Sequence, residues 1–526
     1  MFFGCNKQSD VTSELDTKPT GSNLNINLAY EVFVQSFCDS NDDGIGDIKG
    51  LTSKLDYIHD LGADAIWLMP IMPSPSYHKY DVTDYRDIHP DYGTMDDFKV
   101  FVEEAHNRGI KIIIDFIINH TSSQHPWFLD AKAGPDAKYR DYYVWGDRDS
   151  IADNLSKKEI SFDSDNITQW HAVDGDTSNH QYYYGFFHGA MPDLNFDNPK
   201  VRQEVYDLGN YWLSEVGVDG FRMDAAKHIY PDDRAEDNAN FWKEFKQEME
   251  KVNPDVYIVG EIWSDAGFQA QFAPGFSSLF NFDLAFSILE SVKKESPVTA
   301  SIAGHGWDTD TTKSFVSTLV DKDSLFKSYN SNYVDAIFLS NHDQNRFLSV
   351  LGNDVNSAKF AANILFTLPG IPYLYYGEEI GMQGMKPDEN IREPMLWDFK
   401  KRDSTRTSWL QPVYTTDETV TPVAQQKNDS ESMLNHYKEL SLLRKEHRQI
   451  LKGDLKVLNL DNKSVLAYSY SEGNERLYVI HNLSKKSTII NLPSKEKLVL
   501  GNEEWYDESN KWHLPAQQSL MLKISN

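Results

Sequence analysis

Residues 220–224 have the sequence Gly-Phe-Arg-Met-Asp, a short apolar segment that contains Arg222 and ends at Asp224. Segments of this kind are typical of strands buried on both faces in a parallel sheet. Because side chains alternate along a strand, Arg222 and Asp224 are expected to point to the same face. The guanidinium can then hold the carboxylate ionised and oriented through a charge-assisted hydrogen bond.

Similar apolar segments occur on both sides of this one along the chain. The expected strands cover residues 30–34, 65–69, 110–118, 220–223, 257–259, 279–282, 336–339 and 373–376. Helical patterns lie between them at residues 48–61, 95–108, 199–216, 241–252 and 356–367. Alternation of strand and helix, repeated about eight times, predicts an α/β protein with a (β/α)8 TIM barrel.

Two parts of the chain break this alternation. Residues 120–195 are irregular, rich in Asp, Tyr, Trp and His, and too long for an ordinary loop after the third strand. From about residue 454, short alternating segments predict an antiparallel β-sandwich. We therefore expect a barrel at 26–119 and 196–450, an inserted domain at 120–195, and a C-terminal domain at 451–526.

The first 25 residues have a different character. Met1-Phe2-Phe3-Gly4-Cys5 is similar to the end of a bacterial lipoprotein signal, in which the cysteine becomes lipidated. The polar residues that follow are typical of a flexible tether. We expect residues 1–25 to be a lipoprotein-like tether that attaches the protein to a membrane through Cys5. The protein would then lie outside the cytoplasm, on the bacterial surface or in the periplasm, or else be secreted.

The overall composition narrows the range of partners. The 526 residues carry a formal net charge of -29, which disfavours nucleic acid but permits neutral substrates and divalent cations. The two cysteines, Cys5 and Cys38, are too few to predict a disulfide framework. No apolar run approaches the roughly 20 residues that a membrane helix needs.

Three carboxylates directly follow expected strands, where the chemistry of such barrels takes place. They are Asp224, Glu261 and Asp343. Any one of them alone could be a helix cap or a salt-bridge partner, but three at strand ends indicate a shared site. Two carboxylates in one cleft suit glycoside hydrolysis, in which one protonates the leaving oxygen and the other attacks the sugar or activates water.

The segments around these carboxylates resemble the signature regions of the α-amylase family of glycoside hydrolases. These segments are residues 115–120, 191–195, 220–228, 260–263 and 341–343, in the family's order. The resemblance covers about residues 28–450. It implies a retaining enzyme that cleaves α-1,4-glucosidic bonds in starch, glycogen or maltooligosaccharides, with α-glucan as its partner.

The resemblance also implies a role for each matching residue. Asp224 would be the nucleophile, Glu261 the general acid and then base, and Asp343 would bind sugar hydroxyls and distort the ring. The remaining substrate-binding residues would be Tyr77, His78, Tyr80, Asp115, His120, Arg222, Lys227, His228, Trp263 and His342.

The subfamily is open at this point. Residues 77–80 resemble a Tyr-His-Gly-Tyr segment of α-amylases, with Lys79 in place of glycine. Exo-acting α-glucosidases of the family tend to carry an Asp at the position of Tyr77, so the tyrosine favours cleavage within a chain. Ala225 also resembles α-1,4-acting members, whereas residues 391–397 resemble oligoglucosidases. The alternatives are an α-glucosidase, a maltooligosaccharide transglycosylase, or a non-catalytic glucan-binding homologue.

Residues 39–47, Asp-Ser-Asn-Asp-Asp-Gly-Ile-Gly-Asp, have the oxygen spacing of an EF-hand loop. The ligands of a structural Ca²⁺ would be Asp39, Asn41, Asp43, Asp47 and the carbonyl of Ile45. The twelfth position is Gly50 instead of Glu, so the segment is not a true EF-hand. The alternative is an Asp- and Asn-rich turn that binds no metal.

The family resemblance implies a possible second structural Ca²⁺ between the barrel and the inserted domain. Its ligands would include Asn119, Asp193 and the backbone carbonyl of His228. The ligand from the inserted domain is open, with Asp163 and Asp165 among many candidates.

Overall fold

The structure is a computed structural model that describes residues 26–157, 169–176, 181–303, 306–399, 401, 403–492, 497–507 and 511–525. The predicted tether at 1–25, with Cys5, lies outside the described residues, as do Asp163 and Asp165. Lipidation and location therefore stay predictions. None of the described helices combines the length and the apolarity that crossing a bilayer requires.

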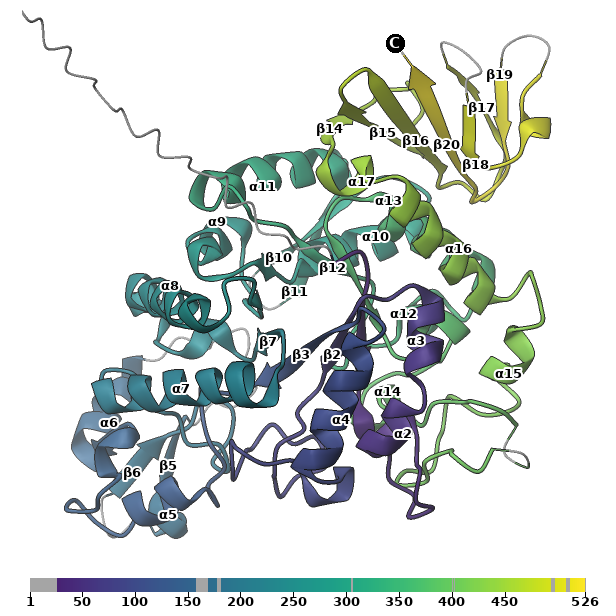
Figure 1. The fold of residues 1–526 in the computed structure, drawn as a ribbon. Coiled ribbons are helices and arrows are strands. Elements are labelled where there is room, and N and C mark those ends of the chain that lie inside the picture. Colours follow the sequence, from purple (N-terminus) through teal and green to yellow (C-terminus); the bar gives the residue numbers. More distant parts are fainter. Residues whose placement is uncertain are drawn as a thin grey trace, which may run out of the picture.

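Eight parallel strands form the central sheet, and each overlaps a predicted strand, the sixth only at Leu279. They are β1 (Ala29–Val32), β2 (Ala65–Leu68), β3 (Lys111–Phe116), β7 (Gly220–Met223), β8 (Tyr257–Gly260), β9 (Ser278–Leu279), β12 (Ala336–Phe338) and β13 (Ile371–Tyr375). Their spatial order is β12-β13-β1-β2-β3-β7-β8-β9. A parallel bridge between Phe280 and Ala336 joins the two edges, so the sheet nearly closes into the predicted barrel (Figure 1).

Helices cover the outside of this barrel (Figure 1). The main ones are α4 (Met95–His106), α7 (Pro199–Tyr211), α8 (Ala235–Val252), α10 (Phe282–Lys294), α11 (Phe315–Tyr329), α13 (Val355–Thr367) and α16 (Met433–Glu446). The single helix predicted at 48–61 is wrong, because the structure has α2 (Ile48–Thr52) and α3 (Leu55–Leu61). The hydroxyls of Thr52 and Ser53 donate to the carbonyls of Ile48 and Gly50, and such bonds compete with helix continuation.

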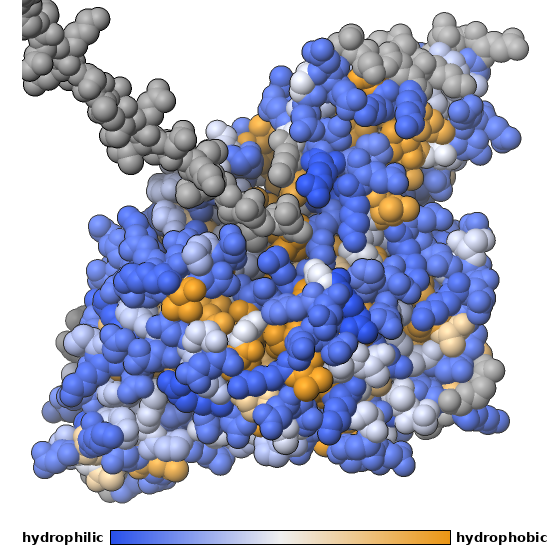
Figure 2. Space-filling model, viewed as in Figure 1, coloured by the Kyte–Doolittle hydropathy of each residue, from blue (hydrophilic) through white to orange (hydrophobic). Residues whose placement is uncertain are grey.

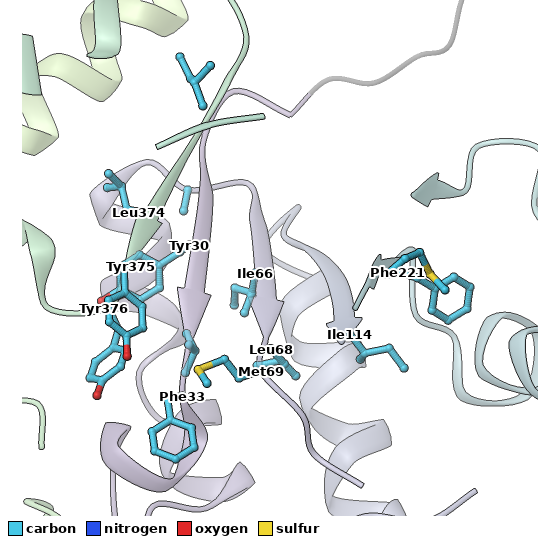
Figure 3. Close-up of a cluster of buried hydrophobic side chains, with 14 of the residues drawn as sticks. Tyr30, Phe33, Ile66, Leu68, Met69, Ile114, Phe221, Leu374, Tyr375 and Tyr376 are labelled. Atoms are coloured by element: carbon cyan, nitrogen blue, oxygen red, sulfur yellow. The ribbon is translucent and has the colours of Figure 1, made fainter. Parts of the chain in front are cut away.

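The alternation of side chains along the strands creates two apolar layers. Trp67, Ile113, Tyr257, Val259 and Tyr373 belong to a cluster of buried side chains contributed by the barrel strands. The intervening residues belong to a separate cluster that also includes the helices. Figure 3 shows part of that second cluster, including Tyr30, Ile66, Leu68, Ile114, Phe221 and Leu374.

The inserted segment after β3 forms a small unit of its own beside the barrel, in blue at the lower left of Figure 1. Its strands β4 (Trp145–Asp147), β5 (Trp170–Ala172) and β6 (Gln181–Tyr184) form an antiparallel sheet in the order β4-β6-β5. Two helices, α5 (Pro126–Ala131) and α6 (Arg148–Lys157), accompany it. An insertion after the third strand is therefore confirmed.

The C-terminal part is antiparallel, as predicted. One sheet has the order β14 (Asp454–Val457), β15 (Val465–Glu472), β16 (Glu475–Asn482), β20 (Ser519–Ser525) and β18 (Lys497–Leu500). A second sheet pairs β17 (Thr488–Asn491) with β19 (Lys511–Leu514). Ile480, Trp512 and Leu520 pack in one core that both sheets share. Hydrophilic residues cover most of the face shown in Figure 2, consistent with the large net charge.

Candidate active site

A polar layer follows the apolar interior at the carboxyl ends of the barrel strands. Glu31 of β1, Asp115 of β3 and Arg222 of β7 occupy it, and all three are at most 2% exposed. Asp115 pairs in register with Arg222, so the two side chains leave adjacent strands at the same level. Burial of these charged groups is tolerable only because each has a partner of opposite charge: Arg222 pairs with Asp115, and Glu31 pairs with His342.

Arg222 brings two of the predicted catalytic carboxylates together. Its Nη1 donates to Asp224 Oδ1 at 2.7 Å and to Asp115 Oδ1 at 2.9 Å. Its Nη2 donates to Glu261 Oε2 at 2.6 Å, and the Ala225 N–H donates to the same oxygen at 3.2 Å. Asp224 and Glu261 therefore lie side by side across one guanidinium at the mouth of the barrel.

The third carboxylate belongs to the same network. Asp343 Oδ2 lies 3.0 Å from His342 Nε2, and its Oδ1 accepts from Arg392 Nη2 at 3.0 Å. On the other side of the imidazole, His342 Nδ1 lies 2.6 Å from Glu31 Oε1. The Tyr80 hydroxyl links the two halves, because it donates to Asp115 Oδ2 at 3.1 Å and lies 2.7 Å from His342 Nε2.

The carboxylates of this network differ in the solvent exposure of their side chains. The side chains of Asp224, Glu261 and Asp343 are 12%, 19% and 38% exposed, whereas that of Asp115 is fully buried. The three predicted catalytic carboxylates therefore reach the mouth. Asp115 lies beneath them and contacts Arg222 and Tyr80.

The network contains more carboxylates than positive charges. Its members are Glu31, Asp115, Asp224, Glu261 and Asp343 against Arg222, His342 and Arg392. Burial raises the pKa of Glu261, Arg222 opposes this rise, and the charge of neighbouring Asp224 adds to it. Five possible negative charges against three positive ones favour retention of a proton. Burial also raises the pKa of Glu31, Asp224 and Asp115, that of Asp115 to about 7. Among the carboxylates with a raised pKa, Glu261 is the most exposed at the mouth.

The pKa of His342 is raised and the pKa of Asp343 is lowered. Burial lowers the pKa of His342, but the carboxylates of Asp343 and Glu31 outweigh it and raise the pKa to about 10. Burial alone would raise the pKa of Asp343, yet the His342 charge and hydrogen bond, with Arg392, hold this pKa well below its usual range. Both groups are therefore charged at neutral pH.

Glu31→Gln is expected to lower the free energy of unfolding by about 3 kcal/mol at pH 6, because it removes one member of a buried ion pair. His342 has a raised pKa in the folded state, so its contribution is complete below pH 6.5 and declines as the pH rises toward 10. The difference from wild type should therefore shrink between pH 6 and pH 9 in calorimetric unfolding. A constant difference across that range would contradict the pairing.

The loop at residues 77–80 presents polar groups beside the carboxylates. His78 Nδ1 accepts from the Tyr80 N–H at 3.1 Å, so the proton of a neutral imidazole resides on Nε2. Burial lowers the pKa of His78, which favours this neutral form. His120 Nε2 lies 3.1 Å from the Tyr80 carbonyl, so it too is held at this loop.

Comparison with known proteins agrees with this geometry. Residues 31–453 match the family model for the alpha amylase catalytic domain, and residues 465–521 match the alpha-amylase SusG C-terminal domain. The chain belongs to the α-amylase family of glycoside hydrolases.

Relatives of this family member carry more than one enzyme name. Alpha-amylase 3 of Dictyoglomus thermophilum is 41% identical and covers 94% of this chain and 93% of its own. A 4-alpha-glucanotransferase of Thermotoga neapolitana is 35% identical over 87% of this chain and 96% of its own. The crystal structure of an alpha-amylase from H. orenii, 40% identical, superposes with a TM-score of 0.82 over 95% of this chain and 99% of its own.

Three of the remaining predicted residues of this α-amylase family member follow neighbouring barrel strands, Lys227 and His228 after β7 and Trp263 after β8. The His228 ring stacks on Phe186 at 4.0 Å, and Lys227 Nζ lies 3.7 Å from Asp232 Oδ2. The Trp263 ring stacks on Phe282 at 4.9 Å, next to the barrel interior. Barrel closure and the inserted domain thus bring together residues that are far apart in the sequence.

Several residues of the site were not predicted from the sequence. Glu31 is a lone acid within an apolar strand, and that exception was a usable indication of function. Arg392 lies in residues 391–397, which had indicated only a subfamily, yet it binds Asp343 and lies 3.2 Å from the Tyr77 hydroxyl. Phe187, from the inserted domain, contacts the rings of both His120 and His228, at 5.6 and 5.4 Å.

The loop at 39–47 folds as a tight, oxygen-rich turn. Asp39 accepts backbone N–H groups through both carboxylate oxygens, including that of Gly44 at 2.7 Å. Asp47 accepts from the Gly50 N–H at 2.8 Å and so caps α2. Within the described ranges, no three His, Cys, Asp or Glu side chains are grouped so that they could hold a metal ion. The donor set itself, with acidic and amide oxygens, is one that Ca²⁺ prefers.

The second predicted metal position is buried at the base of the inserted domain. Asp193 is 5% exposed, and its Oδ1 accepts from the Phe186 N–H at 3.1 Å. Burial raises the pKa of Asp193 well above its usual range. Among the described residues, no hydrogen-bond donor reaches the buried Asn119 Oδ1. A buried acid beside an unsatisfied amide oxygen fits a cation bound between them.

Proposed function

We propose that this enzyme cleaves α-1,4-glucosidic bonds within starch, glycogen or maltooligosaccharide chains, with retention of the anomeric configuration. The observation that carries the proposal is the placement of Asp224 and Glu261 across one guanidinium at the mouth of the barrel. The names of its relatives, an alpha-amylase and a 4-alpha-glucanotransferase, support a glucan with this linkage.

In the first half of the reaction, Asp224 Oδ attacks the anomeric carbon while Glu261 donates its proton to the glycosidic oxygen. The bond from the anomeric carbon to that oxygen breaks, and the shortened glucan leaves. Loss of the proton turns Glu261 into a carboxylate, which Arg222 and the Ala225 N–H already contact. In the second half, Glu261 takes a proton from water, and the oxygen of this water displaces Asp224.

Other residues would fix the sugar for this attack. The charged Asp343 and His342 can bind its hydroxyl groups, and Arg392 orients Asp343. His78 Nε2–H can donate to the sugar because its Nδ1 already accepts from Tyr80. Donors placed before the reaction cost no reorganisation in the transition state.

The product profile on amylose, pullulan and end-blocked maltoheptaose tests the proposal. We expect new reducing ends from amylose and cleavage of the end-blocked substrate. Failure to cleave the blocked chain would replace this proposal with an α-glucosidase. Longer products from maltoheptaose would instead indicate transfer, the activity named for the Thermotoga relative. Binding without any release of reducing ends would point to a non-catalytic homologue.

Calcium is proposed as a structural ligand at residues 39–47 and at Asn119 with Asp193. Saturation at about a hundred times the dissociation constant would stabilise the folded protein by about 2.7 kcal/mol per site. We therefore expect a chelator to lower the melting temperature and added Ca²⁺ to restore it. In calorimetric titration, Asp43→Ala should remove one binding event and Asn119→Ala the other. An unchanged melting temperature with chelator would argue against both sites.

A further inference from the structure

An aromatic pair, Tyr77 and Trp409, is linked to Asp343 through Arg392. The rings of Tyr77 and Trp409 stack with centroids 5.4 Å apart and planes 21° apart. The Phe33 ring meets both edge-on, at 6.4 Å and 5.9 Å. Because the Tyr77 hydroxyl also lies 3.2 Å from Arg392 Nη1, the pair is connected to the residue that orients Asp343.

Trp409 itself is fixed by a distant part of the sequence. Its indole N–H donates to Ser36 Oγ at 2.8 Å, and its backbone N–H donates to the Gly44 carbonyl at 3.0 Å. The N–H of Ser408 donates to the same carbonyl at 2.7 Å. The Asp39 N–H donates in turn to the Thr405 carbonyl at 2.8 Å. The oxygen-rich loop at 39–47 therefore holds the segment that carries Trp409.

Gly44 of the loop lies against Ser408 of this segment. Gly44 has a φ of +90°, which side-chain-bearing residues rarely adopt. A Cβ at this position would lie 2.5 Å from Ser408 Oγ. Because the Gly44 carbonyl accepts from the N–H groups of both Ser408 and Trp409, a shift of the backbone at Gly44 would displace the residues that donate to it.

We propose that Trp409 is a positioning residue for Tyr77, and that the loop at 39–47 controls glucan affinity through it. Trp409 packs against one face of the Tyr77 ring and restricts where that ring can lie. Tyr77 then meets the sugar in a fixed orientation, so less rotational freedom is lost on binding. The identity of the ligand, a glucan, rests on the proposed function. The contacts of Trp409 with Tyr77 and with the loop do not depend on it.

The first test measures maltoheptaose affinity by titration calorimetry in the Glu261→Gln background, where turnover is suppressed. Trp409→Ala should weaken binding about two- to twelvefold, because an aromatic pair contributes about 0.5–1.5 kcal/mol. Trp409→Phe should restore most of the affinity. In the otherwise wild-type enzyme, Trp409→Ala should raise KM more than it lowers kcat. Tyr329→Ala, on the half-exposed surface of α11, is the matched control for loss of an aromatic ring.

The second test acts on the loop alone. Gly44→Ala should weaken maltoheptaose binding, as Trp409→Ala does. Adding Ser408→Gly should recover part of the affinity, because it removes the Ser408 Oγ atom that the new Cβ would meet. Gly44→Ala and Trp409→Ala together should cost less than the product of their separate effects, because both act through Tyr77. The Tyr77→Ala variant should respond little to either change.

The outcomes separate this inference from the proposed function. If the Glu261→Gln protein with no other change binds no maltoheptaose, the proposed function fails. If it binds maltoheptaose but Trp409→Ala leaves the affinity unchanged, the positioning role is overturned. Fully multiplicative effects of Gly44→Ala and Trp409→Ala would overturn the link between the loop and Trp409.

Discussion

Glu261→Gln is expected to reduce kcat on maltooligosaccharides by about three orders of magnitude or more, because the leaving oxygen no longer receives a proton. Glutamine keeps the size of the side chain, and its amide oxygen can still accept from Arg222 Nη2 and the Ala225 N–H. The fold and the substrate affinity should therefore change little. Reducing-end assays and calorimetric melting would measure the two effects separately.

The nature of the leaving group gives a sharper test of this role. A maltosyl fluoride needs little protonation as fluoride departs, so Glu261→Gln should form the covalent intermediate from it at a rate close to wild type. The intermediate should then accumulate, because its hydrolysis also needs Glu261 as a base. Glu215→Gln, at an exposed position just before β7, is the matched control. Equal losses in the rate of intermediate formation from both substrates would exclude Glu261 as the acid.

Asp224→Asn is expected to abolish turnover of both substrates, with a loss of about 10⁴-fold or more, because the covalent step has no nucleophile. The amide can still accept one hydrogen bond from Arg222 Nη1, so the melting temperature should change far less than the activity. Unlike Glu261→Gln, this variant should form the covalent intermediate no faster from maltosyl fluoride than from maltooligosaccharides.

Mass spectrometry distinguishes the two carboxylates directly. Glu261→Gln treated with maltosyl fluoride should gain the mass of one maltosyl group, on the peptide that contains Asp224. Asp224→Asn treated in the same way should gain none. A maltosyl group on another residue of wild type, or on the Asp224→Asn protein, would show that Asp224 is not the nucleophile.

Some features of the site follow from local sequence patterns. The two-residue period of a strand predicted that Arg222 and Asp224 share a face, and their 2.7 Å contact agrees. The strand-end rule predicted that Glu261 and Asp343 would reach the same mouth, and one network of hydrogen bonds and ion pairs joins the two side chains. These predictions succeed because each depends on a few neighbouring residues.

Other features depend on contacts between distant segments, which no local pattern describes. Glu31 pairs with His342, 311 residues away, and Arg392 with Asp343, 49 residues away. The break near Ser53 in the helix predicted at 48–61 depended on hydroxyl groups that compete with the backbone. Gly44 and Trp409 had no apparent relation until the fold placed them in contact.

The sequence alone determined the barrel, the insertion after the third strand, the antiparallel C-terminal region and the three carboxylates. Each of these is a repeated or local pattern of side chains. Only the tertiary structure decided which groups share Arg222, which acids lie buried beneath the mouth, and which rings pack against Tyr77. The physical reason is that pKa values and ring positions depend on burial and on distances between segments, and these exist only when the barrel has closed.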